Sequence, residues 1–219
     1  MKSRTRSCIP DAVFGKLGYP VRLTLAGRLS VGLMIALTCM AAGVHAASEP
    51  ALGLPAAPVT LVEYGSLTCD YCISFHLDVL PEVKRRYIDR GRVRFIFRDF
   101  PTSAAAARGA VAARCVRPDA YYLMLAALFS SAPQWSRAPD VDVALSQQAV
   151  KLGLGGVEFR ACLSDPAIES GIERQRRQAT KDLDVIGTPT FVVNGRVVRG
   201  AHTLEQLEAL IAQASEAAK

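Results

Sequence analysis

Short apolar runs in two parts of the chain are typical of β-strands. Residues 59–64 (VTLVEY) are β-branched and apolar, and residues 92–98 (RVRFIFR) alternate charged with apolar positions, so each run predicts a strand. The intervening residues 69–90 predict a helix, which Pro81 should kink or divide because proline lacks the N–H that the helix needs. These elements make a β-α-β unit.

The strand pattern returns near the end of the chain. Residues 190–194 (TFVVN) and 196–199 flank Asn194-Gly195, a dipeptide typical of hairpin turns, and therefore predict two antiparallel strands. Residues 203–217 predict an amphipathic helix. The apolar stripe of this helix consists of Leu204, Leu207, Leu210 and Ile211.

Helical composition dominates residues 103–185, where proline and glycine residues separate the periodic segments. The helices expected there span residues 104–114, 121–129, 140–152 and 168–183. We therefore expect an α/β fold with one mixed sheet. Residues 59–102 and 186–219 would build the sheet and its flanking helices, and residues 103–185 would be a helical insertion.

The first 46 residues have the pattern of an export signal. Their charge is positive up to Arg28, and an uncharged, apolar run leads to Val44-His45-Ala46, which supplies small residues at the cleavage positions. We expect cleavage after Ala46 and a short arm over residues 47–58. The alternative is an uncleaved membrane anchor, which we disfavour because spanning needs about 20 apolar residues and polar residues dilute this run.

The net charge of +6 belongs mainly to this leader. Residues 1–46 hold six of the 26 Lys and Arg residues and one of the 20 acidic residues, so the remainder carries a net charge of +1. A nearly neutral domain lacks the basic surface typical of nucleic-acid binding, and we expect no nucleic-acid partner.

Cys69 and Cys72 form a Cys-x-x-Cys pair that follows a predicted strand and opens a predicted helix. At a helix N-terminus, free backbone N–H groups and the helix dipole favour a thiolate at the first cysteine, and the pair can exchange disulfides through a mixed intermediate. The alternative is half of a zinc site, which would need two more ligands, usually a second close pair. The sequence offers no such pair, so we expect redox chemistry without a metal or cofactor.

Glu63 interrupts an apolar strand six residues before Cys69. A buried carboxylate is costly without a role, and beneath a dithiol Glu63 would accept and return the proton of Cys72. The alternative is an exposed side chain on an edge strand.

Thr188 and Pro189 directly precede the strand at residues 190–194. Proline belongs at a strand start because it cannot donate to a sheet. A cis bond here would leave the Thr188 backbone free to pair with an extended substrate, whereas the alternative is an ordinary trans-proline turn.

The chain resembles the DsbA-like thioredoxin-fold oxidoreductases, and within them the alphaproteobacterial DsbA type. The matching segments cover most of residues 58–215 in the family's order. They are VEYGSLTCDYC at 62–72, RDFP at 98–101, ARC at 113–115, FRACL at 159–163 and IGTPTFVVNG at 186–195.

This resemblance implies a thioredoxin fold with an inserted helical domain and a periplasmic location. It also implies catalysis by Cys69 and Cys72, a role for Glu63, and substrate binding at Thr188 and a cis Pro189. The clients would be reduced, unfolded exported proteins, and a membrane quinone-linked partner of the DsbB type would reoxidise the protein, which we expect to be a monomer.

The same resemblance implies a second, structural disulfide between Cys115 and Cys162. These residues stand in the two motifs that carry that disulfide in the group. In the loop-entropy model, a cross-link of this span contributes up to about 4 kcal/mol to stability. The alternative is two buried free thiols.

The residues between the active cysteines depart from the family pattern, because Asp70-Tyr71 stands where DsbA proteins typically have Pro-His. A carboxylate opposes a nearby thiolate, so we hypothesise a weaker oxidant with a higher Cys69 pKa than the family extreme. Thr188 before the proline also occurs in disulfide isomerases, so two rivals stay open. One is an isomerase or reductase kept in the dithiol form. We disfavour it because known isomerases resemble dimers with an added N-terminal module, and the short arm leaves no room for such a module. The other is a non-enzymatic metal-binding or chaperone-like export factor.

Two histidines lie near these motifs. We interpret His76, four residues after Cys72, as a partly solvated helix residue, and we place His202 at the edge of the active site without assigning it a role.

Overall fold

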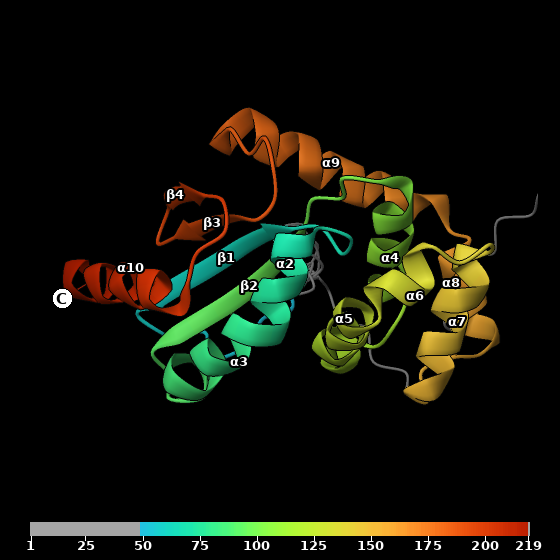
Figure 1. The fold of residues 1–219 in the computed structure, drawn as a ribbon, viewed down its shortest axis with the longest axis horizontal. Coiled ribbons are helices and arrows are strands. Elements are labelled where there is room, and N and C mark those ends of the chain that lie inside the picture. The colour runs from blue at the N-terminus through green and yellow to red at the C-terminus, as the bar shows by residue number, and fades with distance from the viewer. Residues whose placement is uncertain (1–48, 219) are drawn as a thin grey trace, which may run out of the picture. The chain divides into compact units, whose positions relative to one another are not determined.

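A four-stranded mixed sheet organises residues 49–218, the part of the chain that the computed structural model describes (Figure 1). The strand order is β2-β1-β3-β4. Strand β1 (Val59–Gly65) runs parallel to β2 (Val93–Asp99) and antiparallel to β3 (Thr190–Val193), which pairs antiparallel with β4 (Arg196–Arg199). The predicted mixed sheet, assembled from two distant parts of the sequence, is confirmed.

The helical stretch after β1 differs from the expected single kinked helix. It consists of α2 (Asp70–Ser74), the π-helix η1 (Phe75–Val79), α3 (Leu80–Val83) and the π-helix η2 (Lys84–Ile88). Just before Pro81, the Leu80 N–H donates to the Phe75 carbonyl five residues earlier, which makes a wider π turn. This turn accommodates a proline that has no N–H to donate, and the helix continues beyond it.

Six α-helices and one short 3-10 turn lie between β2 and β3 in the sequence. The predicted helices correspond to α4, α5, α7 and α9, whereas α6, α8 and the turn η3 were not predicted. The bounds are α4 (Ala104–Arg114), η3 (Pro118–Ala120), α5 (Tyr121–Ser130), α6 (Ala132–Ser136), α7 (Val141–Lys151), α8 (Val157–Leu163) and α9 (Pro166–Leu183).

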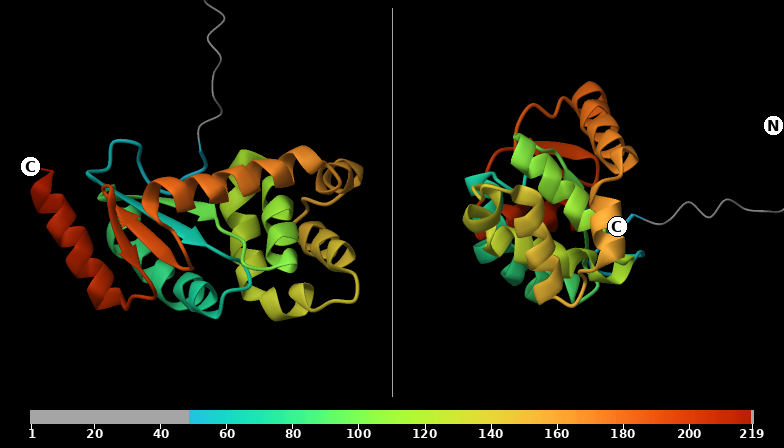
Figure 2. Two further views of the ribbon diagram at one scale, coloured as in Figure 1. Left: turned by 90° about the horizontal axis from the view of Figure 1, so that it is seen from above. Right: turned by 90° about the vertical axis from the view of Figure 1, so that its right-hand side faces the viewer.

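The two faces of the sheet have separate hydrophobic cores, because alternate residues of a strand point to opposite faces. On one face, β1 contributes Val59 and Leu61 to a large cluster that continues into the helical stretch after Cys69 and into the insertion. On the other face, Val62 and Tyr64 pack in a smaller cluster that includes Ala179 of α9. Figure 2 shows α9 lying along this second face and reaching the other insertion helices.

The C-terminal hairpin and helix follow the sequence pattern closely. Asn194 and Gly195 both have positive φ, 45° and 87°, as the tight turn between β3 and β4 requires. Helix α10 (Leu204–Ala217) is capped by Thr203, which forms a capping box with Gln206. Its stripe is buried at Leu207 and Ile211 and half-buried at Leu204 and Leu210.

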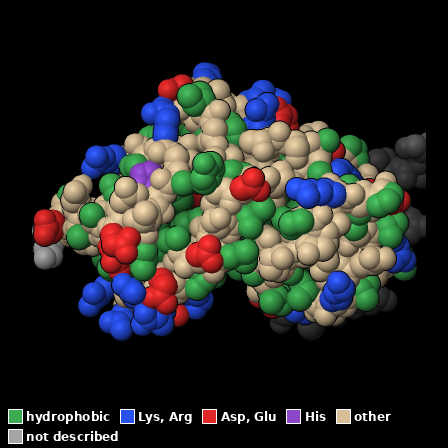
Figure 3. Space-filling model, viewed as in Figure 1, with side chains coloured by type: hydrophobic (Ala, Val, Ile, Leu, Met, Phe, Trp, Pro, Cys, Tyr) green, Lys and Arg blue, Asp and Glu red, His purple; other side chains and the backbone are tan. Residues whose placement is uncertain are grey.

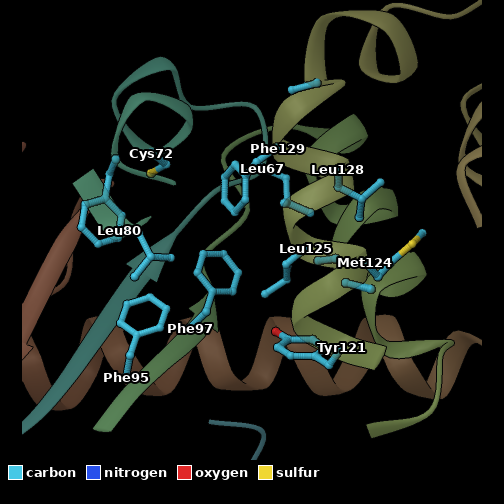
Figure 4. Close-up of a cluster of buried hydrophobic side chains, with 14 of the residues drawn as sticks. Leu67, Cys72, Leu80, Phe95, Phe97, Tyr121, Met124, Leu125, Leu128 and Phe129 are labelled. Carbon is cyan, nitrogen blue, oxygen red and sulfur yellow. The ribbon is translucent and has the colours of Figure 1, made fainter. Parts of the chain in front are cut away.

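The insertion helices pack directly against the segment that leads to the active site. In Figure 4, Leu67 from the loop after β1 and Leu128 and Phe129 from α5 point into one buried cluster. A Cβ added at Gly109 of α4 would lie 3.0 Å from Leu67 and 2.7 Å from Trp135, so glycine permits this close approach. The insertion therefore forms part of the wall around the active site, while its boundaries as a domain, residues 103–185, stay a prediction.

The arm before β1 follows the edge of the sheet. Leu52 forms an antiparallel bridge with Phe95, and Glu49 makes a two-point ion pair with Arg98. The predicted signal peptide, residues 1–46, lies outside the described residues. Within residues 49–218, no helix is both long enough and apolar enough to cross a membrane.

Candidate active site

Cys69 occupies the N-cap of α2, where the loop after β1 turns into the helix. Two pairs of hydroxyl groups hold this loop against the start of the insertion. Ser66 is hydrogen-bonded to Thr102, and Thr68 to Ser103, each at 3.0 Å. Ser103 also caps α4, so the start of the insertion fixes the loop that carries the first cysteine.

The surroundings of Cys69 favour its thiolate. A hydrogen bond from the Cys72 thiol lowers the pKa of Cys69 most, burial opposes this, and bonds from Thr188 and the N–H groups of Cys72 and Tyr71 add to the lowering. The result is a pKa of about 6 instead of 9.0. At pH 7 about nine-tenths of Cys69 is therefore thiolate, the nucleophilic and good leaving form.

Cys72 has the opposite character. It is 0% exposed, and its hydrogen bond to Cys69, its burial and the negative charge of Glu63 all raise its pKa. Figure 4 shows its sulfur facing into the same buried region as Phe97 and Phe129. Cys69 is thus an accessible thiolate and Cys72 a shielded thiol. Disulfide exchange therefore proceeds at the sulfur of Cys69.

Glu63 lies in the sheet beneath this pair. It follows Val59 and Leu61 in the alternating series of β1 that faces the helix after Cys69, and it pairs in register with Phe97 and Phe191 on the two neighbouring strands. Its side chain is 0% exposed, so the alternative of an exposed edge glutamate is wrong.

His76 is the partner of Glu63, and our interpretation of it as a partly solvated residue was wrong. Its side chain is 4% exposed, and its Nε2 lies 2.7 Å from Glu63 Oε2. The available signal was its spacing of four residues from Cys72, which places both side chains on the helix face that packs on the sheet. The same spacing fits an amphipathic surface helix, so the sequence alone did not distinguish the two.

The Thr188-Pro189 peptide bond is cis, in the form that the family resemblance implied. Cys69 Sγ lies 3.4 Å from the Thr188 carbonyl oxygen, across 119 residues of sequence. The structure thereby brings the loop before β3 against the reactive sulfur.

A small cavity lies beside the helical stretch that follows Cys69, between this stretch and the start of β3, and neither cysteine lines it. It measures about 100 Å³, and its wall includes Tyr71, Pro189, Phe191 and His202. Tyr71 and Ile186 on the surrounding surface are 66% and 73% exposed. Figure 3 shows hydrophobic and acidic side chains mixed over the middle of this face.

Cys115 and Cys162 form a disulfide that joins the end of α4 to α8, with a Cα–Cα distance of 5.6 Å. It is the pairing that the resemblance implied. Among residues 49–218, no three His, Cys, Asp or Glu side chains come together as a metal site would require.

Comparison with known proteins gives the same picture. The thioredoxin family model matches residues 45–213. A protein of Rickettsia bellii named as a protein-disulfide oxidoreductase is 28% identical over 173 residues, covering 78% of this chain and 66% of that protein. Disulfide bond formation protein D of Bacillus subtilis is 26% identical, covering 74% of this chain and 75% of that protein.

Among solved structures, alpha-DsbA1 of Wolbachia pipientis is similar over 78% of this chain and 93% of that chain, with a TM-score of 0.72 and 28% identity. The chain spans slightly less than two thirds of the Rickettsia bellii relative's length, 66%. Residues 45–213, which the family model matches, contain the sheet, the insertion helices and both cysteine pairs. The chain belongs to the thioredoxin family, and it has the DsbA-like form of that fold, with helices inserted between β2 and β3.

Proposed function

We propose that this protein is a periplasmic thiol-disulfide oxidoreductase that introduces disulfide bonds into exported proteins through Cys69 and Cys72. The observation that carries the proposal is the asymmetry of the two cysteines. Cys69 has a pKa lowered to about 6 and lies 3.4 Å from the Thr188 carbonyl, whereas Cys72 is buried with a raised pKa.

In the proposed reaction, a client thiolate attacks Cys69 Sγ of the Cys69–Cys72 disulfide. The bond between the two protein sulfurs breaks, and Cys72 leaves and takes up a proton. A second client thiolate then attacks the client sulfur of the mixed disulfide and releases Cys69 as a thiolate. Two electrons pass to the protein, and the client gains one disulfide.

Direction follows from which form of the protein the site stabilises. A Cys69 thiolate that receives several hydrogen bonds stabilises the reduced state, and this makes the disulfide state an oxidant. The pKa of about 6 is higher than the value of about 3.5 known for DsbA, which supports a weaker oxidant. Asp70 is exposed, so solvent screens its carboxylate, and the hydrogen bonds set the pKa.

The clients would be reduced, unfolded exported proteins, bound by the apolar surface beside Tyr71 and by backbone pairing at Thr188. A quinone-linked membrane protein of the DsbB type would reoxidise Cys69 and Cys72. Export through a cleaved signal peptide is part of the same proposal.

The direct test is oxidation of reduced, unfolded ribonuclease A by the mature protein in its disulfide form. We expect one client disulfide per molecule of protein, and no transfer by Cys69→Ala. Full support of client folding in cells by the Cys69→Ala/Cys72→Ala variant, which cannot transfer a disulfide, would exclude the enzymatic proposal and favour a chaperone-like role. Thiol trapping in cells separates oxidase from isomerase, because an isomerase is held in the dithiol form.

A further inference from the structure

The buried pair of Glu63 and His76 has a feature that its hydrogen bond leaves unexplained. Glu63 Oε2 is bound by His76 Nε2 at 2.7 Å, and an ionised carboxylate only accepts, so the imidazole donates. The other oxygen, Oε1, is buried and has no hydrogen-bond partner among the residues that the structure describes. A buried acceptor without a partner costs about 1–3 kcal/mol, so such an atom calls for an explanation in function.

The space around the carboxylate is kept open by a glycine. A Cβ at Gly65 would lie 2.8 Å from Glu63 Oε1 and 2.5 Å from Phe97 Cε2. Gly65 is an ordinary strand residue without positive φ, so the close approach is the reason that glycine suits this position.

Aromatic side chains enclose the imidazole. Phe129 of α5 stacks on His76 with ring centroids 3.7 Å apart, and Phe75 and Phe97 each contact it edge-on at 5.4 Å. This enclosure excludes water and holds the ring in one orientation. The insertion helix α5, whose Tyr122 hydroxyl bonds the backbone of β2, therefore covers the pair from the side of that strand.

The titratable groups that face the pair come from two elements, α2 with its N-cap and α5. Cys72 on α2 is near enough for the Glu63 charge to raise its pKa, and Cys69 acts on Cys72 in turn. Tyr122 on α5 is also influenced by Glu63, although burial is the main cause of its raised pKa, and its hydroxyl is already bonded to the backbone of β2. Of these groups, Cys72 is the one that must gain and lose a proton during exchange.

Building on the proposed function, we propose that His76 is a positioning residue for proton transfer at Cys72. Its Nε2–H holds one oxygen of Glu63, which fixes the orientation of the carboxylate and leaves Oε1 as the acceptor for the Cys72 proton.

The step runs as follows when the reduced protein is reoxidised. Cys69 is in a mixed disulfide, and Cys72 must attack Cys69 Sγ. The Cys72 proton passes to the Glu63 carboxylate, a bond forms between the two protein sulfurs, and the partner's sulfur leaves as a thiolate. In the reverse direction Cys72 leaves as a thiolate and takes the proton back, so the electrons and the proton balance in both directions.

Removing the imidazole has a defined consequence. A buried carboxylate without a charged or donating partner takes up a proton, because burial disfavours its ionised form. A protonated Glu63 cannot accept from Cys72 at pH 7, and the attack of Cys72 then slows. The attack of Cys69 on a partner disulfide precedes this step and does not need Glu63.

The experiment follows the reduced mature protein as glutathione disulfide oxidises it, from pH 5 to 10, by acid quenching and mass spectrometry. Formation of the Cys69–glutathione mixed disulfide and its resolution by Cys72 appear as separate phases. For His76→Leu and Glu63→Gln we expect resolution to be at least about tenfold slower at pH 7 and to recover at high pH, with formation of the mixed disulfide within about twofold of wild type.

Two further variants define the role. Gln Nε2 can take the place of His Nε2 as a donor, so His76→Gln should keep resolution within about threefold of wild type. Glu63→Gln/His76→Leu should be no slower than Glu63→Gln alone, because one residue acts through the other. Leu145→Val, in the buried core of α7 and outside the sheet and the active-site helix, is the control for lost packing and should leave the pH profile unchanged.

A wild-type pH profile in His76→Leu, with Glu63→Gln slowed, would overturn the proposal and leave the proposed function intact. If His76→Leu does not fold, His76→Gln decides, because resolution as slow as in Glu63→Gln would also overturn the proposal. Failure of wild-type Cys69 to form any mixed disulfide would instead refute the proposed function.

Discussion

Replacing Cys72 by alanine tests the origin of the Cys69 thiolate. The hydrogen bond from the Cys72 thiol is the largest cause of the lowered Cys69 pKa, and the substitution removes this donor. The N–H groups at the start of the helix and the Thr188 side chain remain. The expected result is therefore a partial rise of the Cys69 pKa.

The size of the rise follows from the strength of one bond. A hydrogen bond to a charged group contributes about 1.5–3 kcal/mol, and one pKa unit corresponds to about 1.4 kcal/mol, so the pKa should rise by about 1–2 units. From about 6 the pKa would then move to about 7–8. At pH 7 the thiolate fraction would fall from about nine-tenths to between about a half and a tenth.

The assay is the absorbance of the thiolate at ultraviolet wavelengths during a pH titration of Cys72→Ala, with the reduced wild-type protein as reference. Cys115 and Cys162 do not contribute, because they are joined in a disulfide. Thr188→Val is the matched variant, since it removes a smaller contribution and should raise the pKa less than Cys72→Ala does. An unchanged Cys69 pKa in Cys72→Ala would refute the hydrogen bond as the leading cause.

Three further predictions concern stability and the carboxylate. Cys115→Ala/Cys162→Ala should have a free energy of unfolding about 4 kcal/mol lower in guanidinium, because the cross-link spans 47 residues. The variant should still exchange disulfides at Cys69. A loss below about 1 kcal/mol would contradict the structural role. Between about pH 6 and 9, the folded reduced protein holds fewer protons at Cys69 than the unfolded chain, so the Cys69 contribution to the free energy of unfolding should increase with pH over that range. This contribution should disappear as the pH falls through about 6, and it should be missing in Cys69→Ser. Gly65→Ala should lower the free energy of unfolding by about 1–3 kcal/mol, because the added methyl group crowds Phe97 and Glu63. It should also slow the resolution of the mixed disulfide by Cys72. An unchanged free energy of unfolding would show that the sheet adapts to the added methyl group.

The regular parts of the fold could be predicted because local signals agreed with the tertiary structure. Strands β1 to β4 carried clear apolar runs, and Asn194-Gly195 identified the hairpin between β3 and β4. Cys69 and Cys72 could be identified because a strand–helix junction gives a Cys-x-x-Cys pair its redox meaning.

The remaining features depend on contacts between distant residues. Helix α8 (Val157–Leu163) follows glycines and is only seven residues long, so its periodicity is weak, and packing and the disulfide to Cys115 hold it in place. The π turns before and after Pro81 depend on backbone geometry that composition does not encode. The burial of His76 depends on Phe129, which comes 53 positions later in the chain and stacks on the imidazole.

The equilibrium reduction potential of Cys69 and Cys72, measured against glutathione with the mature protein, tests the central claim most directly. Hydrogen bonds that stabilise the Cys69 thiolate predict a potential between the glutathione poise of about −240 mV and the DsbA value of about −120 mV. A value near the thioredoxin potential of about −270 mV would contradict the account, because such a protein would reduce its clients instead of oxidising them.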